Sequence, residues 1–356
     1  MLIVLIISAA VVSGAVLWRQ HSDDDKRRAA AIPQDIPYLI WDRQNEAYSM
    51  QMLEYYLSER TPQVAIRNNP EFEWRDLCAY HFWVRSFSVT TYENTNYKVY
   101  HFVYTNDAGN MESMTKELET EAEDIIRTVR SMQYGDPWDE MLAVHDELIR
   151  RTQFVRSDDG GEHIRDLYGA LVEHKAVCQG YAYAFTYLLD KLGYHSSDIY
   201  SKEHLWNRAD DLMGSERYID VTWDDYNNAD RNGVPYIHHD FFCITKEEMA
   251  LFDDHTPESD AIEEDTGGAG DNYYRRKQYY ISSGDTIAFR ASALEQFHSG
   301  KNLLEFRFES KDDFDKAAEE IKVILATLGY KEKYYTYSKN ELLTFSVGLY
   351  PPVDAE

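Results

Sequence analysis

Residues 168–194, YGALVEHKAVCQGYAYAFTYLLDKLGY, decide the fold expected for this chain. Apolar side chains recur at helical spacing from residue 182 to 192. Gly193 is placed to end this helix, because glycine adopts the left-handed conformation that closes a helix without strain. A short helix is also expected over 165–174. The pattern therefore predicts that Cys178 stands at the start of a buried helix.

Two further residues stand out downstream, His204 in HLWN and Asp220 in YIDVTWDD. The sequence predicts strands over 196–209 and 217–224, joined by a turn. His204 and Asp220 fall on these consecutive strands, so one side chain from each can meet on one face. An aspartate on so apolar a strand is expected to be buried, and a buried carboxylate needs a partner.

Cysteine, histidine and aspartate together can form a nucleophilic site. The thiolate is the reactive form of cysteine, and a free thiol has a pKa of about 8.5. A neighbouring imidazole can take the thiol proton, and a carboxylate can fix the imidazole tautomer. Taken one at a time, such residues are more often buried small hydrophobes or surface residues, so their context has to decide.

That context resembles the bacterial form of the transglutaminase-like superfamily, whose fold is papain-like. The segments around Cys178, His204 and Asp220 resemble its nucleophile helix, histidine strand and aspartate strand, in order and near the usual spacing. The resemblance covers roughly residues 97–290, and a weaker likeness extends from residue 45 and to residue 350. The resemblance implies Cys178 as the nucleophile, His204 as general base and acid, and Asp220 as the orienting carboxylate. Leu205 departs from the family, which usually has a small residue at that position.

Stabilisation of an oxyanion would need hydrogen-bond donors beside the thiol. The backbone N–H of Cys178 is the natural first donor. Tyr168 and Gln179 are candidates for the second donor on proximity alone, although a packed tyrosine and a surface glutamine are equally ordinary interpretations. Trp206 could wall the thiol or carry the apolar part of an acyl group, and core packing is its alternative role.

The complete sequence predicts an α+β fold. Its core is papain- or transglutaminase-like, with the nucleophile helix packed on an antiparallel sheet, and a small α+β unit follows at the C-terminus. The expected segments are a membrane anchor or uncleaved signal at 1–18, a linker at 19–38, a transglutaminase-like domain at 45–292 with its core at 97–250, and a C-terminal α+β subdomain at 298–350. Helices are expected over 45–59, 111–133, 137–152 and 311–328, and strands over 80–91, 97–105, 303–309, 330–337 and 343–348.

Composition excludes several classes of protein. The 356 residues are 44% hydrophobic and 28% charged, which argues against a disordered, collagen-like or multispan membrane chain. A net charge of −27 repels phosphate backbones, so no nucleic-acid partner is expected. Three cysteines do not make a disulfide framework.

The first 18 residues carry no charged side chain and are long enough to cross a thin bilayer. A cleaved signal peptide is disfavoured, because no basic segment precedes the apolar run and no clean A-x-A site comes after it. We therefore expect a single membrane anchor. Arg19 and 26–28 favour a cytoplasmic location for the chain beyond the anchor, but large domains cross membranes regardless of such charges. We expect the catalytic domain to be extracellular.

No metal or cofactor is expected. His238, His239 and Asp240 are metal-ligand types, but neighbouring residues of an extended chain point to opposite sides. The segment from Asn228 to Gly233 resembles the start of a calcium loop, yet His239 occupies the position where glutamate is required. There is no Walker loop and no G-x-G-x-x-G motif.

The expected activity is thiol-dependent acyl transfer from amide bonds of proteins or peptides, including a cell-surface polypeptide. Water as acceptor would make a cysteine protease or isopeptidase, and a lysine amine would make a transglutaminase. The sequence favours hydrolysis slightly, because water needs no second binding site. The alternative is a non-catalytic peptide-binding or scaffold module on the same fold. An amidase of the peptide N-glycanase type is disfavoured, because no zinc-binding cysteine pairs are present.

Overall fold

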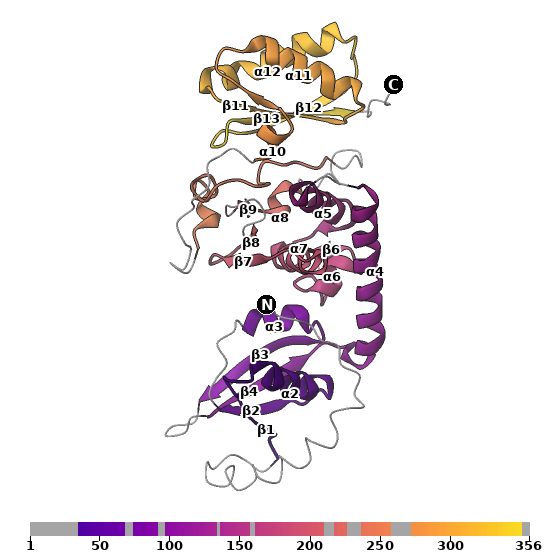
Figure 1. Ribbon diagram of the computed structural model, residues 1–356, viewed down its shortest axis with the longest axis vertical. Helices are drawn as coiled ribbons and strands as arrows, with labels where there is room; N and C mark the ends of the chain where they lie inside the picture. Colours follow the sequence, from indigo (N-terminus) through magenta and orange to yellow (C-terminus); the bar gives the residue numbers. More distant parts are fainter. Residues whose placement is uncertain are drawn as a thin grey trace. The chain divides into compact units, whose positions relative to one another are not determined.

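The computed structural model describes residues 35–67, 74–91, 97–133, 136–156, 161–209, 217–225, 236–257 and 272–350. In these residues, helices are mixed with four separate sheets, which is the α+β class expected from the sequence. The chain divides between Glu117 and Leu118 into two compact units, each described here by itself (Figure 1). Within the described residues, no helix is both long enough and apolar enough to span a bilayer. The predicted anchor at 1–18 lies outside these residues, as does the linker up to residue 34.

The first unit is one sheet with a helix packed on it. Its elements are β1 (Tyr38–Ile40), α2 (Glu46–Ser58), β2 (Gln63–Arg67), α3 (Trp74–Tyr80), β3 (Val84–Thr91) and β4 (Tyr97–Tyr104). The strand order is β1-β2-β4-β3, with β1 parallel to β2 and the other pairs antiparallel. Leu53 and Leu57 of α2 pack against Val64 and Ile66 of β2. The strand expected over 80–91 begins later, because Tyr80 still belongs to α3.

Helices dominate the start of the second unit. After α4 (Met111–Ser131), which crosses the boundary, come α5 (Pro137–Arg151), β5 (Gln153–Phe154), α6 (Leu167–Leu171), β6 (Lys175–Ala176) and α7 (Cys178–Leu192). Pro137 occupies the first turn of α5, where its missing N–H is no loss. Gly193 ends α7 in the left-handed conformation, with φ of 91°, as the sequence predicted. Phe185 and Leu188 of α7 are completely buried.

The sheet beside α7 corrects the sequence prediction. Three antiparallel strands are present rather than two, namely β7 (Ser196–Tyr200), β8 (Leu205–Ala209) and β9 (Arg217–Ile219). The expected first strand is broken after Tyr200, because Ser201 and His204 close a tight turn through hydrogen bonds to each other. The expected second strand stops at Ile219, because the Asp220 carboxylate caps the short helix α8 (Val221–Asp224).

The second unit ends in a four-stranded sheet covered by two helices, α11 (Thr286–His298) and α12 (Lys311–Thr327). The strands of this sheet are β10 (Tyr280–Ile281), β11 (Leu303–Phe308), β12 (Lys333–Lys339) and β13 (Thr344–Tyr350). It is preceded by the short helices α9 (Lys246–Met249), η3 (Asp253–His255) and α10 (Tyr273–Arg276). The strand order is β10-β11-β13-β12. Phe289 of α11 and Ile321 of α12 share a core with Phe306 of β11. At Gly348 a side chain would come within 2.7 Å of the Tyr236 ring, so the segment 236–240 lies tight against this sheet.

Candidate thiol site

The first turn of α7 is held close to the loop before α6. The Val177 N–H donates to the Ile164 carbonyl at 2.9 Å. Gly180 allows this approach, because a Cβ there would lie 2.8 Å from the Ala176 side chain and 2.9 Å from the Ile164 carbonyl oxygen. Val177 is the N-cap and has no side-chain acceptor to offer the first amides of the helix. Cys178 is the first residue of α7, as the sequence predicted, and it is partly exposed.

His204 precedes β8 directly and is fixed from two sides. Its backbone N–H donates to Ser201 Oγ at 3.0 Å. Its ring lies nearly parallel to the Trp206 ring, with centroids 5.9 Å apart and 15° between the planes. The His204 side chain is only 8% exposed, so it is largely shielded from solvent.

Asp220 lies at the end of β9, which is paired with β8. Its side chain is completely buried. The backbone N–H of Trp223 donates to Oδ1 at 3.0 Å, and His204 Nε2 donates to Oδ2 at 2.6 Å. His204 and Asp220 therefore lie in contact, as the sequence predicted. Asp220 is the N-cap of α8, however, and not part of a strand.

Asp220 sets the charge of His204. Burial alone would lower the pKa of His204, but the Asp220 charge and hydrogen bond outweigh it. A hydrogen bond and an electrostatic interaction with Cys178 add to this effect, and the pKa of His204 rises from 6.5 to about 10. Burial likewise favours a protonated Asp220, yet the charge of His204 and the hydrogen bonds it receives hold the pKa of this carboxyl well below its usual range. His204 therefore carries a proton at neutral pH.

Asp220 occupies one ring nitrogen of His204, Nε2. Nδ1 is therefore the nitrogen available to a second partner, and Cys178 is one of the groups that raise the pKa of this ring. An imidazole held in this way can pass a proton between a sulfur and a second group while its carboxylate partner keeps the ring in place. The arrangement has the parts that nucleophilic thiol chemistry requires.

His255 is a site residue that the sequence analysis missed. It lies in η3 (Asp253–His255), directly after two aspartates. His255 Nε2 donates to Asp220 Oδ2 at 2.7 Å. A single histidine in an acidic, aperiodic stretch gives no signal that could have identified it.

The structure assigns no role to the other predicted site residues. Tyr168 is half-buried on α6, where its ring meets His163 edge-on at 5.1 Å. Gln179 follows the thiol on α7 and is half-buried. Trp206 is 1% exposed and lies against the His204 ring. Tyr168 and Gln179 remain predictions as oxyanion donors, and Trp206 remains one as an acyl wall.

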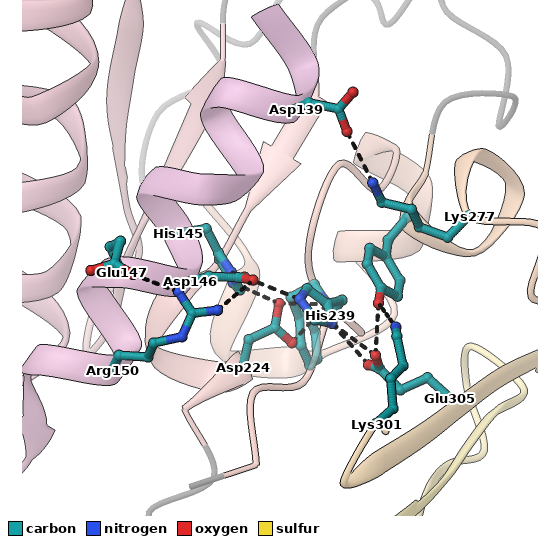
Figure 2. Close-up of polar contacts among 12 residues, drawn as sticks. Asp139, His145, Asp146, Glu147, Arg150, Asp224, His239, Lys277, Lys301 and Glu305 are labelled. Carbon is teal, nitrogen blue, oxygen red and sulfur yellow. Dashed lines mark hydrogen bonds and ion pairs between the residues drawn. The ribbon is translucent and has the colours of Figure 1, made fainter. Parts of the chain in front are cut away.

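Two clusters among the described residues have the donor spacing that a cation could use. In the first, His204 and His255 lie 2.6 and 2.7 Å from one oxygen of Asp220, which are hydrogen-bond lengths that leave no space for an ion. The second joins Asp146 to His145 and His239, both at 3.1 Å (Figure 2). The other ring nitrogen of His145 faces Asp224, and that of His239 faces Glu305. Hydrogen bonds from protonated ring nitrogens therefore satisfy these carboxylates.

His238 and His239 point in different directions, as expected for neighbours in an extended segment. His238 lies within 3.3 Å of Ser346 Oγ, while His239 lies between Asp146 and Glu305. The calcium-like segment from Asn228 to Gly233 lies outside the described residues.

Comparisons with known proteins give only distant similarities. No protein-family model matches the chain, and no curated protein matches it. Among solved structures, one described as a TGase has a TM-score of 0.25 and 12% identity, covering 53% of this chain and 60% of its own. A candidate cysteine protease from Cytophaga hutchinsonii has a TM-score of 0.24 and 10% identity, covering 38% and 61%. Menin has a TM-score of 0.24 and 21% identity, covering 33% and 28%. This chain thus spans less than two thirds of each of these structures, and similarity at this level says nothing about activity.

Proposed function

We propose that this protein is a thiol-dependent acyl-transfer enzyme of the transglutaminase-like kind, acting on amide bonds of proteins or peptides. The observation that carries the proposal is the hydrogen bond of 2.6 Å between His204 and the buried Asp220 carboxylate. Cys178, at the start of α7, is among the groups that raise the pKa of His204. Sequence resemblance around the same three residues supports it independently.

In the proposed reaction, the Cys178 sulfur attacks the amide carbonyl carbon and a new C–S bond forms. The C–N bond then breaks, and the departing amine or ammonia takes a proton from His204 Nδ1. The product is a thioester on Cys178. Water or a lysine amine next attacks the thioester carbonyl, and His204 accepts the proton from that nucleophile. The C–S bond then breaks, the acid or the new amide is released, and the Cys178 thiolate and protonated His204 are restored. Asp220 keeps the imidazole oriented and stabilises its charge in both halves.

The acceptor decides between hydrolysis and crosslinking. We propose hydrolysis as the principal reaction, because water needs no second binding site. The proposed setting is the outer face of a cell membrane, with the protein held by residues 1–18 and acting on surface polypeptides. Incubation with glutamine-containing peptides, with and without a primary amine, distinguishes the outcomes. Free acid marks hydrolysis, and an amine adduct marks crosslinking.

The first test is the alkylation rate of each cysteine by iodoacetamide, assigned by mass spectrometry on the full chain. Cys78 is the matched control, because it is partly buried like Cys178, and Cys243 is a buried reference. Cys178 should react fastest at pH 6, and His204→Ala should abolish that lead. If Cys178 reacts no faster than Cys78, the enzyme proposal fails and the peptide-binding alternative takes its place.

A further inference from the structure

Asp220 is shared by two histidines, and only one of them belongs to the proposed reaction. His204 Nε2 and His255 Nε2 lie 2.6 and 2.7 Å from the same oxygen, Oδ2. Both His255 and Asp220 have completely buried side chains. A buried histidine aimed at the carboxylate that orients another histidine calls for a physical explanation.

The hydrogen bonds of the two His255 ring nitrogens indicate which tautomer is present. An ionised carboxylate only accepts, so His255 must hold its proton on Nε2 to bond with Asp220. Its other nitrogen, Nδ1, is buried and has no hydrogen-bond partner among the described residues. A proton on Nδ1 would be an unsatisfied buried donor, so the arrangement suits a neutral imidazole that donates from Nε2 alone.

The direction of this donor is set by aromatic packing. The His255 ring packs against Trp206 and Trp223, with centroid distances of 4.9 and 4.5 Å, and lies nearly parallel to Phe241 at 5.7 Å. It also meets the His204 ring edge-on at 5.0 Å. Rings on several sides leave little freedom to turn the imidazole away from Asp220.

We infer that His255 is a positioning residue that fixes the Asp220 carboxylate and shares its charge, so that His204 is held at the correct angle to Cys178. This inference rests on the proposed function and deepens it, since it extends the site from three residues to four. The groups that titrate around His255 are Asp220 and His204. Lys339 lies nearby, over the rings of Trp223 and Phe241 at 5.1 and 5.2 Å.

Two substitutions distinguish the effect of the Nε2–H hydrogen-bond donor of His255 from the effect of its ring shape. His255→Phe keeps an aromatic ring and removes the donor, while His255→Gln offers an amide N–H near the position of Nε2. Loss of one hydrogen bond to a charged group should slow alkylation of Cys178 about 10- to 100-fold in His255→Phe. His255→Gln should restore most of the rate. His81→Phe is the control, because His81 is also buried and lies in the other unit.

A second readout follows His204 directly by NMR titration of its ring protons in the full chain. Without the His255 donor, Asp220 directs more of its charge at His204, so the pKa of His204 should rise further in His255→Phe. A merely structural histidine would slow alkylation in both variants without moving that titration, and this result would overturn the inference. Unchanged rates in both variants would overturn it equally.

The two proposals fail separately. If His204→Ala leaves Cys178 reactivity unchanged, the enzyme proposal falls, while the titration of His204 still decides the role of His255. Should His255→Phe fail to fold, nitrogen shifts of the wild-type ring decide instead. A proton on Nε2 supports the inference, and a proton on Nδ1 contradicts it.

Discussion

The charge on His204 depends mainly on one buried neighbour, and Asp220→Asn tests that dependence. Burial lowers the pKa of His204, and Asp220, with a smaller contribution from Cys178, raises it to about 10. Without the carboxylate charge, the pKa of His204 should fall to about 6.5 or below, its value in an unfolded chain. His204 would then be neutral at pH 8, where the wild type is protonated. An NMR titration of the His204 ring measures this change.

Asp124→Asn is the control for that experiment. Asp124 is an exposed carboxylate in an ion pair with Arg151 at 2.8 Å, in the same unit but outside the site. Its loss should leave the His204 titration where it is. Equal titration midpoints in Asp220→Asn and the wild type would mean that something other than Asp220 holds the proton.

At the scale of one element, the placement of α7 depends on a glycine at its first turn. A Cβ at Gly180 would meet the Ile164 carbonyl oxygen at 2.9 Å, so Gly180→Ala should push the start of α7 outward. Overpacking of this kind costs about 1–3 kcal/mol in the free energy of unfolding. The larger effect should be on Cys178, because the proposed approach of its sulfur to His204 depends on the position of this first turn. Urea unfolding and the alkylation rate measure the two effects separately.

Gly193, at the other end of the same helix, provides a matched comparison. Its φ is 91° and a Cβ there would meet nothing within 4 Å, so Gly193→Ala strains only the backbone. Such strain should cost about 1 kcal/mol and leave the thiol rate unchanged. If both alanine variants slow alkylation equally, the close approach at Gly180 is not what places Cys178.

Elements with strong local signals were predictable from the sequence, and those that depend on tertiary contacts were not. The bounds of α7 follow from its apolar spacing and Gly193, and both agree with the structure. The break after Tyr200 was missed, because it depends on hydrogen bonds between Ser201 and His204 that no periodicity encodes. His255 was missed for a related reason, since its importance lies in reaching Asp220 from 35 positions away in sequence.

At the scale of the second unit, a chain of buried charges joins its helical part to its last sheet. His239 Nδ1 lies 2.9 Å from Glu305 of β11, and His239 Nε2 lies 3.1 Å from Asp146 of α5 (Figure 2). Tyr273 also donates to Glu305, at 2.9 Å. Because Glu305 is 2% exposed, its loss leaves buried polar groups without their acceptor.

Glu305→Gln should therefore destabilise this unit much more than the loss of a surface ion pair. Removing one partner of a buried pair costs about 3–5 kcal/mol, whereas an exposed pair contributes about 0–1 kcal/mol. Glu320→Gln is the matched control, because Glu320 is partly exposed and pairs with Arg290 between α11 and α12 at 2.8 Å. Calorimetric unfolding of each variant gives the comparison, and equal losses would show that the buried chain of charges adds nothing special.

The ion pair between His239 and Glu305 also predicts how the loss of stability in Glu305→Gln changes with pH. Burial alone would lower the pKa of His239, but the charges of Glu305 and Asp146 raise it to about 10. A raised pKa gives stability that is complete below the unfolded value of about 6.5 and is lost as the pH rises through the folded value. Burial favours a protonated Glu305, yet the charge of His239 lowers the pKa of that carboxyl, so its contribution is present above the unfolded value of about 4.3. The deficit of Glu305→Gln should therefore be greatest between about pH 4.3 and 6.5 and shrink towards pH 10. A deficit that grows as the pH rises from 7 to 10 would mean that His239 is not the charged partner of Glu305.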